Sequence, residues 1–192
     1  MTETEIKEIV QKQRSYFYTG VTLPVEKRLD ALKKLKTCIQ KYEPLINEAL
    51  KRDLGKSNFE SYMCEVGLVL SELSYMIRHT PSYAKEKTVL TPLAQFASRS
   101  YKKPSPYGVV LVMSPWNYPF LLTIDPLIDA IAAGNTVVLK PSAYSPHTSR
   151  VIETIITECF DSQYVAVVNG GRAENNTLLN EHFDYIFFTG SQ

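Results

Sequence analysis

The stretch Gly108-Val-Val-Leu-Val-Met113 decides the fold class, because it opens a regular alternation of β-branched runs and helix-compatible segments. We expect strands at residues 108–113, 136–139, 164–168 and 185–188, and helices at residues 120–133, 147–159 and 178–181 between them. Runs that are apolar throughout are typical of strands buried on both faces of a parallel sheet. The sequence therefore predicts an α/β fold with a doubly wound, mostly parallel, Rossmann-like sheet over residues 107–192.

The first 83 residues have helical periodicity instead. Apolar residues recur every three or four positions, which predicts helices at residues 5–18, 24–39, 42–54 and 63–80, with Gly55 as a stop signal and Pro81 beyond the last. Residues 84–106 are rich in Lys, Thr, Ser and Pro, and the segment 94–101 is short enough to be an extended arm or a hairpin. The expected organisation is a helical part at 1–83, a connector at 84–106 and a partial nucleotide-binding sheet at 107–192.

The composition is that of a folded, nearly neutral protein. The chain has 192 residues, 44% of them apolar, with 21 Lys and Arg against 20 Asp and Glu, for a net charge of +1. These values exclude a disordered or collagen-like chain and give no reason to expect nucleic acid or a membrane surface as a partner. The uncharged stretch 107–124 contains Pro115 and Pro119, so we expect no membrane span. The charged N-terminus lacks the apolar run of a signal peptide, and a cytoplasmic location is expected.

The cysteines and histidines show no pattern of a reactive or metal-binding site. Cys38, Cys64 and Cys159 form no CxxC pair, and no histidine lies within a few residues of any of them. We interpret them as structural thiols in a reducing setting and predict no metal site. The three histidines are scattered and form no HxH or HxxxH pair, so none is a candidate catalytic residue.

Polar segments follow the predicted strands at the ends where parallel α/β sheets bind ligands. They are residues 114–119, 140–145, 169–172 and 189–192. In the first of them Asn117 stands between two prolines, and a stiff turn would hold its amide in one direction, as a donor to a developing oxyanion requires. The alternative is a turn amide bonded to its own backbone. If Asn117 is considered without the other segments, this alternative is favoured.

Lys140 and the segment Thr189-Gly190-Ser191 are candidates for nucleotide binding. Lys140 starts at the rim of the sheet, and its ammonium could reach a sugar hydroxyl or a phosphate; the alternative is a solvated surface lysine. Thr189-Gly-Ser191 has the small and hydroxyl-bearing residues with which a phosphate-binding turn begins. There is no GxGxxG motif, and Gly170-Gly171 alone is a weak signal.

Together these segments resemble the aldehyde dehydrogenase superfamily, and most of all the branch called class 3 or fatty aldehyde dehydrogenase. The resemblance rests on Ser114-Pro-Trp-Asn-Tyr-Pro-Phe120, Ala132-Ala-Gly-Asn-Thr-Val-Val-Leu-Lys-Pro-Ser142, Val168-Asn-Gly-Gly171 and Phe183-Asp-Tyr-Ile-Phe-Phe-Thr-Gly-Ser191. Tyr107-Gly-Val-Val110 and Asp53-Leu-Gly-Lys56 also fit. The match runs in order over essentially the whole chain and covers the N-terminal portion of the family's fold only.

The resemblance implies NAD(P)-dependent oxidation of an aldehyde to a carboxylic acid. In that family a cysteine thiolate attacks the carbonyl, hydride leaves to the nicotinamide, and a glutamate-activated water hydrolyses the thioester. Carried over by motif, Asn117 is the catalytic oxyanion donor, and the cofactor is NAD or NADP. The implied cofactor-binding residues are Ser114, Pro115 and Trp116 in the cofactor channel, Lys140 at the adenosine ribose, Ser142 in the same motif, Gly171 near the adenine, Gly190, and Ser191 at the pyrophosphate.

Two departures from the family pattern carry predictions. The family usually has Glu after Lys-Pro-Ser to hold the ribose 2′-hydroxyl, whereas this chain has Ala143. Because no carboxylate would repel a 2′-phosphate there, we hypothesise that NADP is tolerated or preferred. In the family the nucleophilic cysteine and the glutamate base lie beyond the Phe-Thr-Gly-Ser segment. Residues 1–192 alone are therefore expected to lack the catalytic domain and dehydrogenase activity.

Three hypotheses about function follow from these patterns. The first is the N-terminal part of an aldehyde dehydrogenase, whose substrate is a small-molecule aldehyde. The second is a non-enzymatic protein that keeps the same fold to bind a nucleotide or a partner. The third is a related acyl-phosphate or semialdehyde reductase, and the segment Pro115-Trp-Asn-Tyr-Pro-Phe120 favours the first over it. By analogy with the family, the connector at 84–106 is expected to support a homodimer.

Overall fold

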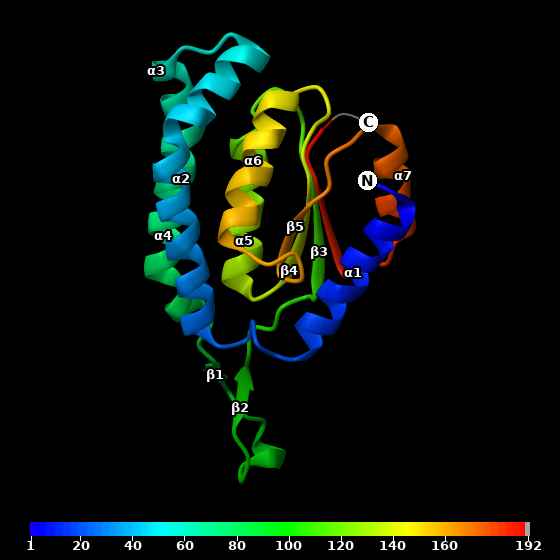
Figure 1. The fold of residues 1–192 in the computed structure, drawn as a ribbon. Coiled ribbons are helices and arrows are strands. Elements are labelled where there is room, and N and C mark those ends of the chain that lie inside the picture. Colours follow the sequence, from blue (N-terminus) through cyan, green and yellow to red (C-terminus); the bar gives the residue numbers. More distant parts are fainter. Residues whose placement is uncertain (191–192) are drawn as a thin grey trace.

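The computed structural model describes residues 1–190, which form helical layers, a four-stranded sheet and a projecting hairpin (Figure 1). The helices are α1 (Glu3–Tyr18), α2 (Val25–Leu54), α3 (Asn58–Ser61), α4 (Gly67–Tyr83), α5 (Leu121–Ala133), α6 (Pro146–Cys159) and α7 (Arg172–Asn180), with a π-helical turn η1 (Tyr62–Val66) and a 3-10 turn η2 (Leu93–Gln95). The strands are β1 (Lys87–Val89), β2 (Ser100–Lys102), β3 (Val109–Met113), β4 (Thr136–Lys140), β5 (Val165–Val167) and β6 (Tyr185–Phe188). No helix within residues 1–190 combines the length and the apolar composition that crossing a bilayer requires.

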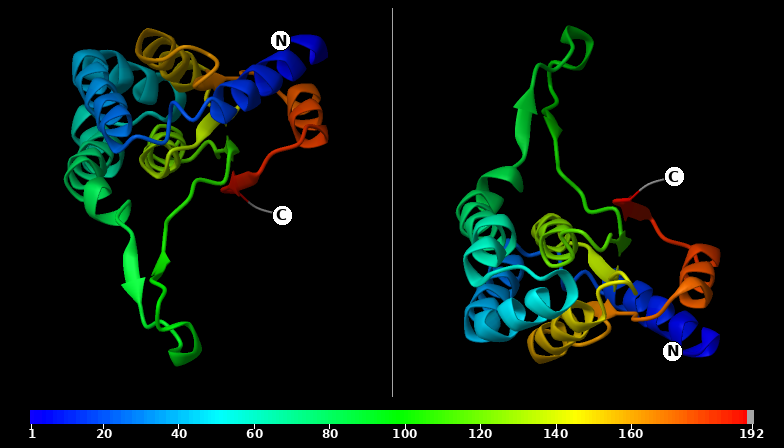
Figure 2. Two further views of the ribbon diagram at one scale, coloured as in Figure 1. Left: turned by 90° about the horizontal axis from the view of Figure 1, so that it is seen from below. Right: turned by 90° about the horizontal axis from the view of Figure 1, so that it is seen from above.

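Strands β3 to β6 form a parallel sheet in the order β5-β4-β3-β6. Val110 pairs with Val137 of β4 on one side and with Tyr185 of β6 on the other. Helices α5 and α6 connect β3 to β4 and β4 to β5 on one face, where α2 and α4 pack against them, whereas α1 and α7 lie on the opposite face (Figures 1 and 2). The prediction of a doubly wound, mostly parallel sheet with N-terminal helices is confirmed.

Successive residues of the central strand β3 point to opposite faces and enter two separate cores. Val110 and Val112 belong to the larger core, which is shared with α2, α4, α5 and α6. Leu111 and Met113 belong to the smaller core, which includes Ile6 of α1. Because both faces are covered, every residue of β3 and β4 is buried, as their apolar runs predict.

Strand β6 differs from the other strands of the sheet. It lies at the edge, where its described partner is β3, and the side chains of Tyr185–Phe188 are 38–58% exposed. The prediction of a strand buried on both faces is therefore wrong for β6. The reason is that α1 packs on β3 and β4 and leaves this edge uncovered.

Two predicted helix ends, the break at residues 40–41 and the end before Pro81, are absent from the structure. Helix α2 runs unbroken through Pro44, and α4 continues through Pro81. Pro44 and Gln40 are exposed, so the Gln40 carbonyl that loses its helical hydrogen bond can face water. Ile39 and Ile46, on either side of Pro44, are fully buried in the larger core. Burial of one stripe along the whole length therefore keeps α2 in one piece.

Helix α7 is longer than predicted, because it begins at Arg172 rather than near Leu178. The backbone N–H of Gly171, just before the helix, donates to Oε2 of Glu174 in the first turn at 2.8 Å. Leu178 is the one buried residue of α7. Apolar periodicity therefore marks the end of this helix and gives no signal for its start.

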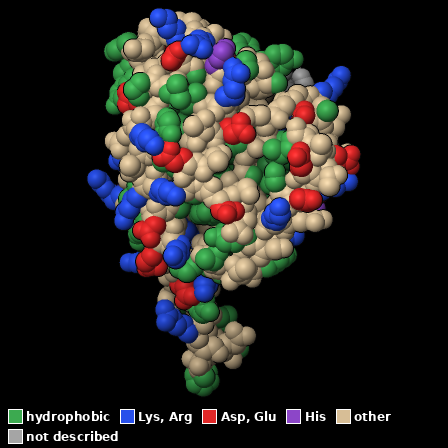
Figure 3. All heavy atoms as spheres, in the orientation of Figure 1, with side chains coloured by type: hydrophobic (Ala, Val, Ile, Leu, Met, Phe, Trp, Pro, Cys, Tyr) green, Lys and Arg blue, Asp and Glu red, His purple; other side chains and the backbone are tan. Residues whose placement is uncertain are grey.

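The connector forms a hairpin that projects away from the body (Figures 1 and 2). Strands β1 and β2 pair antiparallel, with Thr88 opposite Tyr101, so the hairpin alternative is the correct one. At its end Leu90, Leu93 and Phe96 are 96, 88 and 84% exposed. Apolar side chains can be seen at this tip in Figure 3. The tip thus presents an uncovered apolar surface in the single chain.

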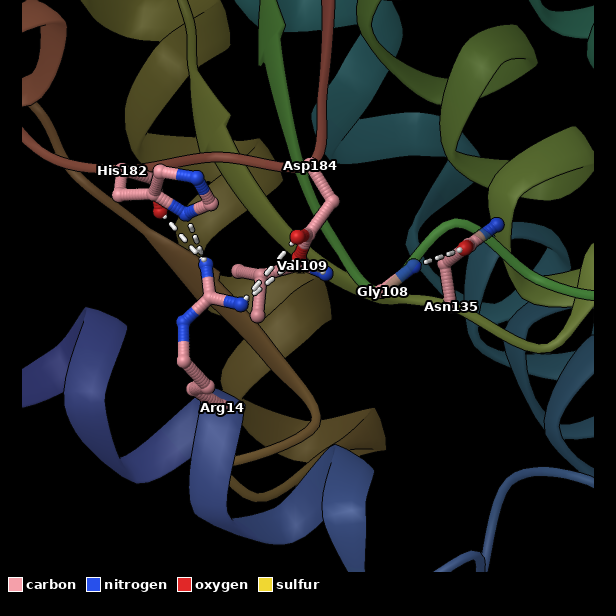
Figure 4. A network of polar contacts seen from close by, with 6 residues as sticks. All are labelled: Arg14, Gly108, Val109, Asn135, His182 and Asp184. Carbon is pink, nitrogen blue, oxygen red and sulfur yellow. Dashed lines mark hydrogen bonds and ion pairs between the residues drawn. The ribbon is translucent and has the colours of Figure 1, made fainter.

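A polar network fixes the amino ends of the strands (Figure 4). Asp184, just before β6, accepts from the N–H of Val109 at 2.7 Å and pairs with Arg14 of α1 at 3.0 Å. The N–H of Gly108 donates to Oδ1 of Asn135 at 3.0 Å. Gly108 has a φ of 139°, and a Cβ there would lie 2.3 Å from Oδ2 of Asp184. These motif residues therefore hold strands together at the end of the sheet away from the expected ligand.

Candidate functional site

A cavity of about 550 Å³ opens at the carboxyl ends of the strands. The chain after β4 leaves toward α6 on one face of the sheet, whereas the chain after β5 leaves toward α7 on the other. Loops that diverge in this way leave a crevice between them, which is where doubly wound sheets bind ligands. The topology therefore places the cavity at the position expected for a nucleotide.

The structure brings together half of the predicted cofactor-binding residues. The cavity is lined by Ser114, Lys140, Ser142 and Gly171. Pro115 and Trp116 belong to the loop that leads away from β3 and do not contribute to the lining. Gly190 follows β6 and is also outside the described lining, which includes Phe188 from that strand. The predicted residue Ser191 lies outside the described residues.

Lys140 is a buried residue of the cavity wall. It is 4% exposed, and its Nζ donates to the carbonyl of Pro141 at 2.8 Å. Burial lowers the pKa of its ammonium, and the nearby Glu174 partly offsets this effect. The alternative of a solvated surface lysine is wrong. A cation that is buried at the edge of a cavity is suited to donate to a ligand that replaces its lost hydration.

The loop after β3 begins at Ser114, which lines the cavity, and carries Asn117, which is outside the described lining. Ser114 anchors the start of this loop, because its Oγ lies 2.5 Å from Oγ1 of Thr123 in α5. Asn117 is exposed, and within residues 1–190 its side chain forms no hydrogen bond. The alternative of a turn amide bonded to its own backbone is therefore wrong. The amide of Asn117 is left available as a hydrogen-bond donor.

Two residues of α7 line the cavity although neither is a predicted site residue: Arg172 ends the polar segment 169–172, and Asn175 lies outside it. Arg172 is exposed at the first position of the helix, and Asn175 lies one turn later. Oδ1 of Asn175 is buried and has no hydrogen-bond partner in the described part of the chain. The signal that could have identified both was Gly170-Gly171, had it been interpreted as the start of a helix.

The charges around the cavity favour an anionic ligand. Its two charged lining residues are Lys140 and Arg172, and none of the described lining residues is acidic. Glu174 is turned back onto its own helix, where the backbone N–H groups of Glu174 and Gly171 hold the pKa of its carboxyl below the usual value. The arrangement can therefore hold a ligand with phosphate groups.

The sequence matches the model of the aldehyde dehydrogenase family over residues 1–192. This chain belongs to the aldehyde dehydrogenase family. It is 45% identical to 4,4′-diaponeurosporen-aldehyde dehydrogenase of Staphylococcus aureus over 93% of its own length and 39% of that protein. It is 40% identical to the dimeric NADP-preferring aldehyde dehydrogenase of Canis lupus familiaris over 98% of its length and 42% of that protein. The chain thus spans about two-fifths of the length of these relatives.

The solved structure of Staphylococcus aureus AldH in its substrate-bound state has the same fold. It superposes with a TM-score of 0.95 at 44% identity, over 97% of this chain and 41% of that one. The resemblance to the N-terminal portion of this family, including its class 3 members, is confirmed. The incomplete aldehyde dehydrogenase fold predicted from the sequence is confirmed with it.

None of the thiols of this aldehyde dehydrogenase family chain lines the cavity. Cys38 and Cys159 are buried in the larger core, and Cys64 is half-buried in η1. Burial, together with the neighbouring Cys38 thiol, raises the pKa of Cys159 well above its usual range, which leaves it unreactive. The interpretation as buried structural thiols is confirmed for Cys38 and Cys159. Residues 1–190 contain no group of three or more His, Cys, Asp or Glu side chains placed to hold a metal ion.

Proposed function

We propose that the protein containing residues 1–192 oxidises aldehydes to carboxylic acids with NAD or NADP. In this proposal the chain binds the dinucleotide and supplies the oxyanion donor Asn117. The observation that carries it is the cavity between the diverging β4 and β5 loops in a chain of this family. None of the three cysteines lines the cavity, so the thiolate of the reaction would come from outside this stretch.

The residues around the cavity fit an adenine dinucleotide. Lys140 offers a buried ammonium to a ribose hydroxyl. Asn175 lines the same cavity, and its buried Oδ1, which lacks a partner in the described structure, would accept from a ligand only after the side chain turns. At Gly171 a Cβ would meet nothing within 4 Å, so the backbone there is open to an approaching ring. When bound, the nicotinamide would accept hydride from the substrate carbon. The protein's own contribution is to hold the dinucleotide against the sheet edge.

Asn117 is proposed to donate from its side-chain amide to the carbonyl oxygen of the aldehyde. The donor is useful because negative charge develops on that oxygen as a nucleophile attacks, and a bond that strengthens in the transition state lowers the barrier. Among the described residues no competing bond holds the amide of Asn117, so none has to break first.

The kinetic test replaces Asn117 with alanine in the complete protein. The Asn117→Ala variant is expected to lower kcat by about 10²–10³-fold, the usual effect of losing one oxyanion donor, with KM for the dinucleotide unchanged. The matched control is Asn180→Ala, because Asn180 is exposed at the far end of α7. A normal kcat in Asn117→Ala would exclude the proposed role of this amide.

Calorimetric titration of the 192-residue chain tests the binding half of the proposal. The chain is expected to bind NADP and NAD and to show no aldehyde turnover. If neither dinucleotide binds, the assignment of the cavity is wrong. If the complete protein binds a dinucleotide and oxidises no aldehyde, the proposed oxidation is wrong and the non-enzymatic binding protein replaces it.

We also propose that NADP is used at least as well as NAD. Ala143 lines the cavity where a carboxylate would repel a 2′-phosphate, and the cations Lys140 and Arg172 line the same cavity. The relative from Canis lupus familiaris is described as NADP-preferring, which supports the proposal. Replacing Ala143→Glu is expected to shift the ratio of NADP to NAD efficiency toward NAD by about tenfold or more, as one repelled charge would. A wild-type enzyme that strongly prefers NAD would contradict it.

The exposed apolar hairpin tip supports a further proposal that the protein forms a homodimer. Leu90, Leu93 and Phe96 present apolar surface away from the body, which is typical of an interface. Sedimentation velocity of the complete protein should give a dimer, and the double variant Leu93→Asp/Phe96→Asp should shift it to monomer. A monomeric wild type would contradict the proposal.

A further inference from the structure

We propose that Lys56 and Glu65 are positioning residues, which hold the backbone on both sides of Asn117. The inference rests on the function proposed for Asn117 and goes beyond it, because neither residue lines the cavity. Both come from the N-terminal helical part, far in sequence from the loop that they contact. The segment Asp53-Leu-Gly-Lys56 is part of the family resemblance, and the contact with the Asn117 loop gives its lysine a structural role.

Lys56 contacts the loop at the residue that carries the proposed donor. Its Nζ donates to the main-chain carbonyl of Asn117 at 3.1 Å and lies 2.6 Å from Oε1 of Glu65. The same ammonium lies over the ring of Tyr118, 4.2 Å from its centre. The lysine therefore fixes the direction of the peptide that follows Asn117, on which the direction of the side chain depends.

Glu65 holds the other end of the loop. Its Oε2 accepts from the backbone N–H groups of Phe120 at 2.8 Å and Leu121 at 3.1 Å. These groups lie at the start of α5, where helical N–H groups have no partner within the helix and where a negative charge is stabilised. The carboxylate thus fixes the point at which the Asn117 loop becomes helix.

The local structure around Glu65 is a second, independent observation. Glu65 lies in the π-helical turn η1, in which the N–H of Gly67 donates to the carbonyl of Tyr62, five residues earlier. A Cβ on Gly67 would lie 2.7 Å from that carbonyl oxygen, so glycine permits the wide turn. Such turns are frequent at functional sites because they redirect side chains. Here the side chain of Glu65 is fully buried beside Lys56.

Stability alone does not account for this arrangement. Replacing a buried ion pair with groups that carry no charge is often neutral for folding, because removing two charges from water costs about as much as their attraction returns. What an uncharged pair cannot supply is the bond from Lys56 to the Asn117 carbonyl. The distinctive contribution of the pair is therefore the geometry of the loop.

The test compares three variants of the pair. Lys56→Met alone would leave the buried Glu65 carboxylate without a counter-charge and is expected to destabilise the chain. The double variant Lys56→Met/Glu65→Gln removes both charges and keeps an acceptor for the start of α5. It is expected to unfold in urea at nearly the wild-type midpoint. Lys56→Arg keeps a donor and serves as the conservative rescue.

The chain's single tryptophan, Trp116, lies next to Asn117 and reports on the loop directly. In the 192-residue chain, the double variant is expected to increase the fast component of the Trp116 anisotropy decay at least about twofold. In the complete protein it is expected to lower kcat by about tenfold or more, with both KM values unchanged, as a misplaced catalytic group does. Lys56→Arg should restore most of both properties.

A matched control and two opposite outcomes make the test decisive. Lys41→Met/Glu158→Gln removes an exposed ion pair, 2.7 Å long, that joins α2 to α6 and includes no residue of the Asn117 loop, and it should change neither readout. The proposal is overturned if the double variant keeps the wild-type anisotropy decay or the wild-type kcat. If Asn117→Ala keeps the wild-type kcat, both the oxyanion function of Asn117 and the positioning role of the pair are wrong. If Asn117→Ala loses kcat and the double variant keeps it, only the positioning role is wrong.

Discussion

The two ends of the parallel sheet are built in opposite ways. At the amino ends Asn135 accepts from the N–H of Gly108 and Asp184 accepts from the N–H of Val109, while Arg14 pairs with Asp184 (Figure 4). At the carboxyl ends the loops separate around a cavity, and some polar side chains there lack the partners that the amino ends provide. Oδ1 of Asn175 is without a partner among the described residues, and Lys140 is buried with a carbonyl as its acceptor.

This difference shows how a single sequence segment can contribute to both ends of the sheet. The segment that begins with Gly108 ends with the loop of Asn117, and the segment that contains Asn135 ends with Lys140. The first half of each segment closes the sheet at one end, and the second half supplies the cavity at the other. Polar groups that are satisfied stabilise the fold, whereas those left without partners are available to a ligand at some cost in stability.

The largest expected effect comes from crowding the amino ends of the strands, called the closed end below; the carboxyl ends, around the cavity, are the open end. Gly108→Ala combines a φ of 139° with a Cβ 2.3 Å from Oδ2 of Asp184, and we expect a loss of about 3 kcal/mol or more in the free energy of unfolding. The same change at the open end, Gly171→Ala, meets nothing within 4 Å and should cost less than about 1 kcal/mol. Urea unfolding measures both, and equal losses would contradict the comparison.

An intermediate effect is expected from Asp184→Ala. The change leaves the Val109 N–H and the Arg14 guanidinium without their carboxylate, and the expected loss is about 2 kcal/mol. The control is Lys12→Ala, which breaks a 3.7 Å pair with Glu8 that is more than half exposed and should cost less than about 0.5 kcal/mol. If thermal unfolding ranks the two variants in the reverse order, the network at the closed end is not the stabilising one.

The smallest expected effect is a gain in stability at the open end. Lys140→Met removes a buried ammonium that has no carboxylate partner among the described residues, and we expect unfolding to cost about 1 kcal/mol more while dinucleotide binding weakens. A destabilised variant with normal binding would show that Lys140 is structural.

The same lysine predicts a pH dependence. Burial lowers the pKa of Lys140 in the folded state, so at alkaline pH the unfolded chain holds a proton that the folded chain has released. The stability of the wild type relative to Lys140→Met should therefore rise with pH through the interval between the folded and unfolded pKa values. Urea midpoints measured across the alkaline range test the sign, and a relative decrease would contradict it.

Local patterns predicted most of the fold and part of the site. The alternation from Gly108 onward identified the sheet because strands and helices have different apolar periods, and all four strands lie where it placed them. The same reasoning failed at residues 40–41, where it predicted a break that burial of Ile39 and Ile46 overrides, and at the start of α7, which buries little. Periodicity reports the burial of side chains, and it is silent where a helix is exposed.

The sequence by itself determined the family, the parallel sheet and the segments that carry Asn117 and Lys140, because these depend on local composition and short spacing. The tertiary structure decided what those residues face. It buried Lys140 in the cavity wall, left the amide of Asn117 available, and brought Lys56 to a loop 61 positions away. Burial and contact between distant segments depend on how the layers pack, and that packing is a property of the whole chain.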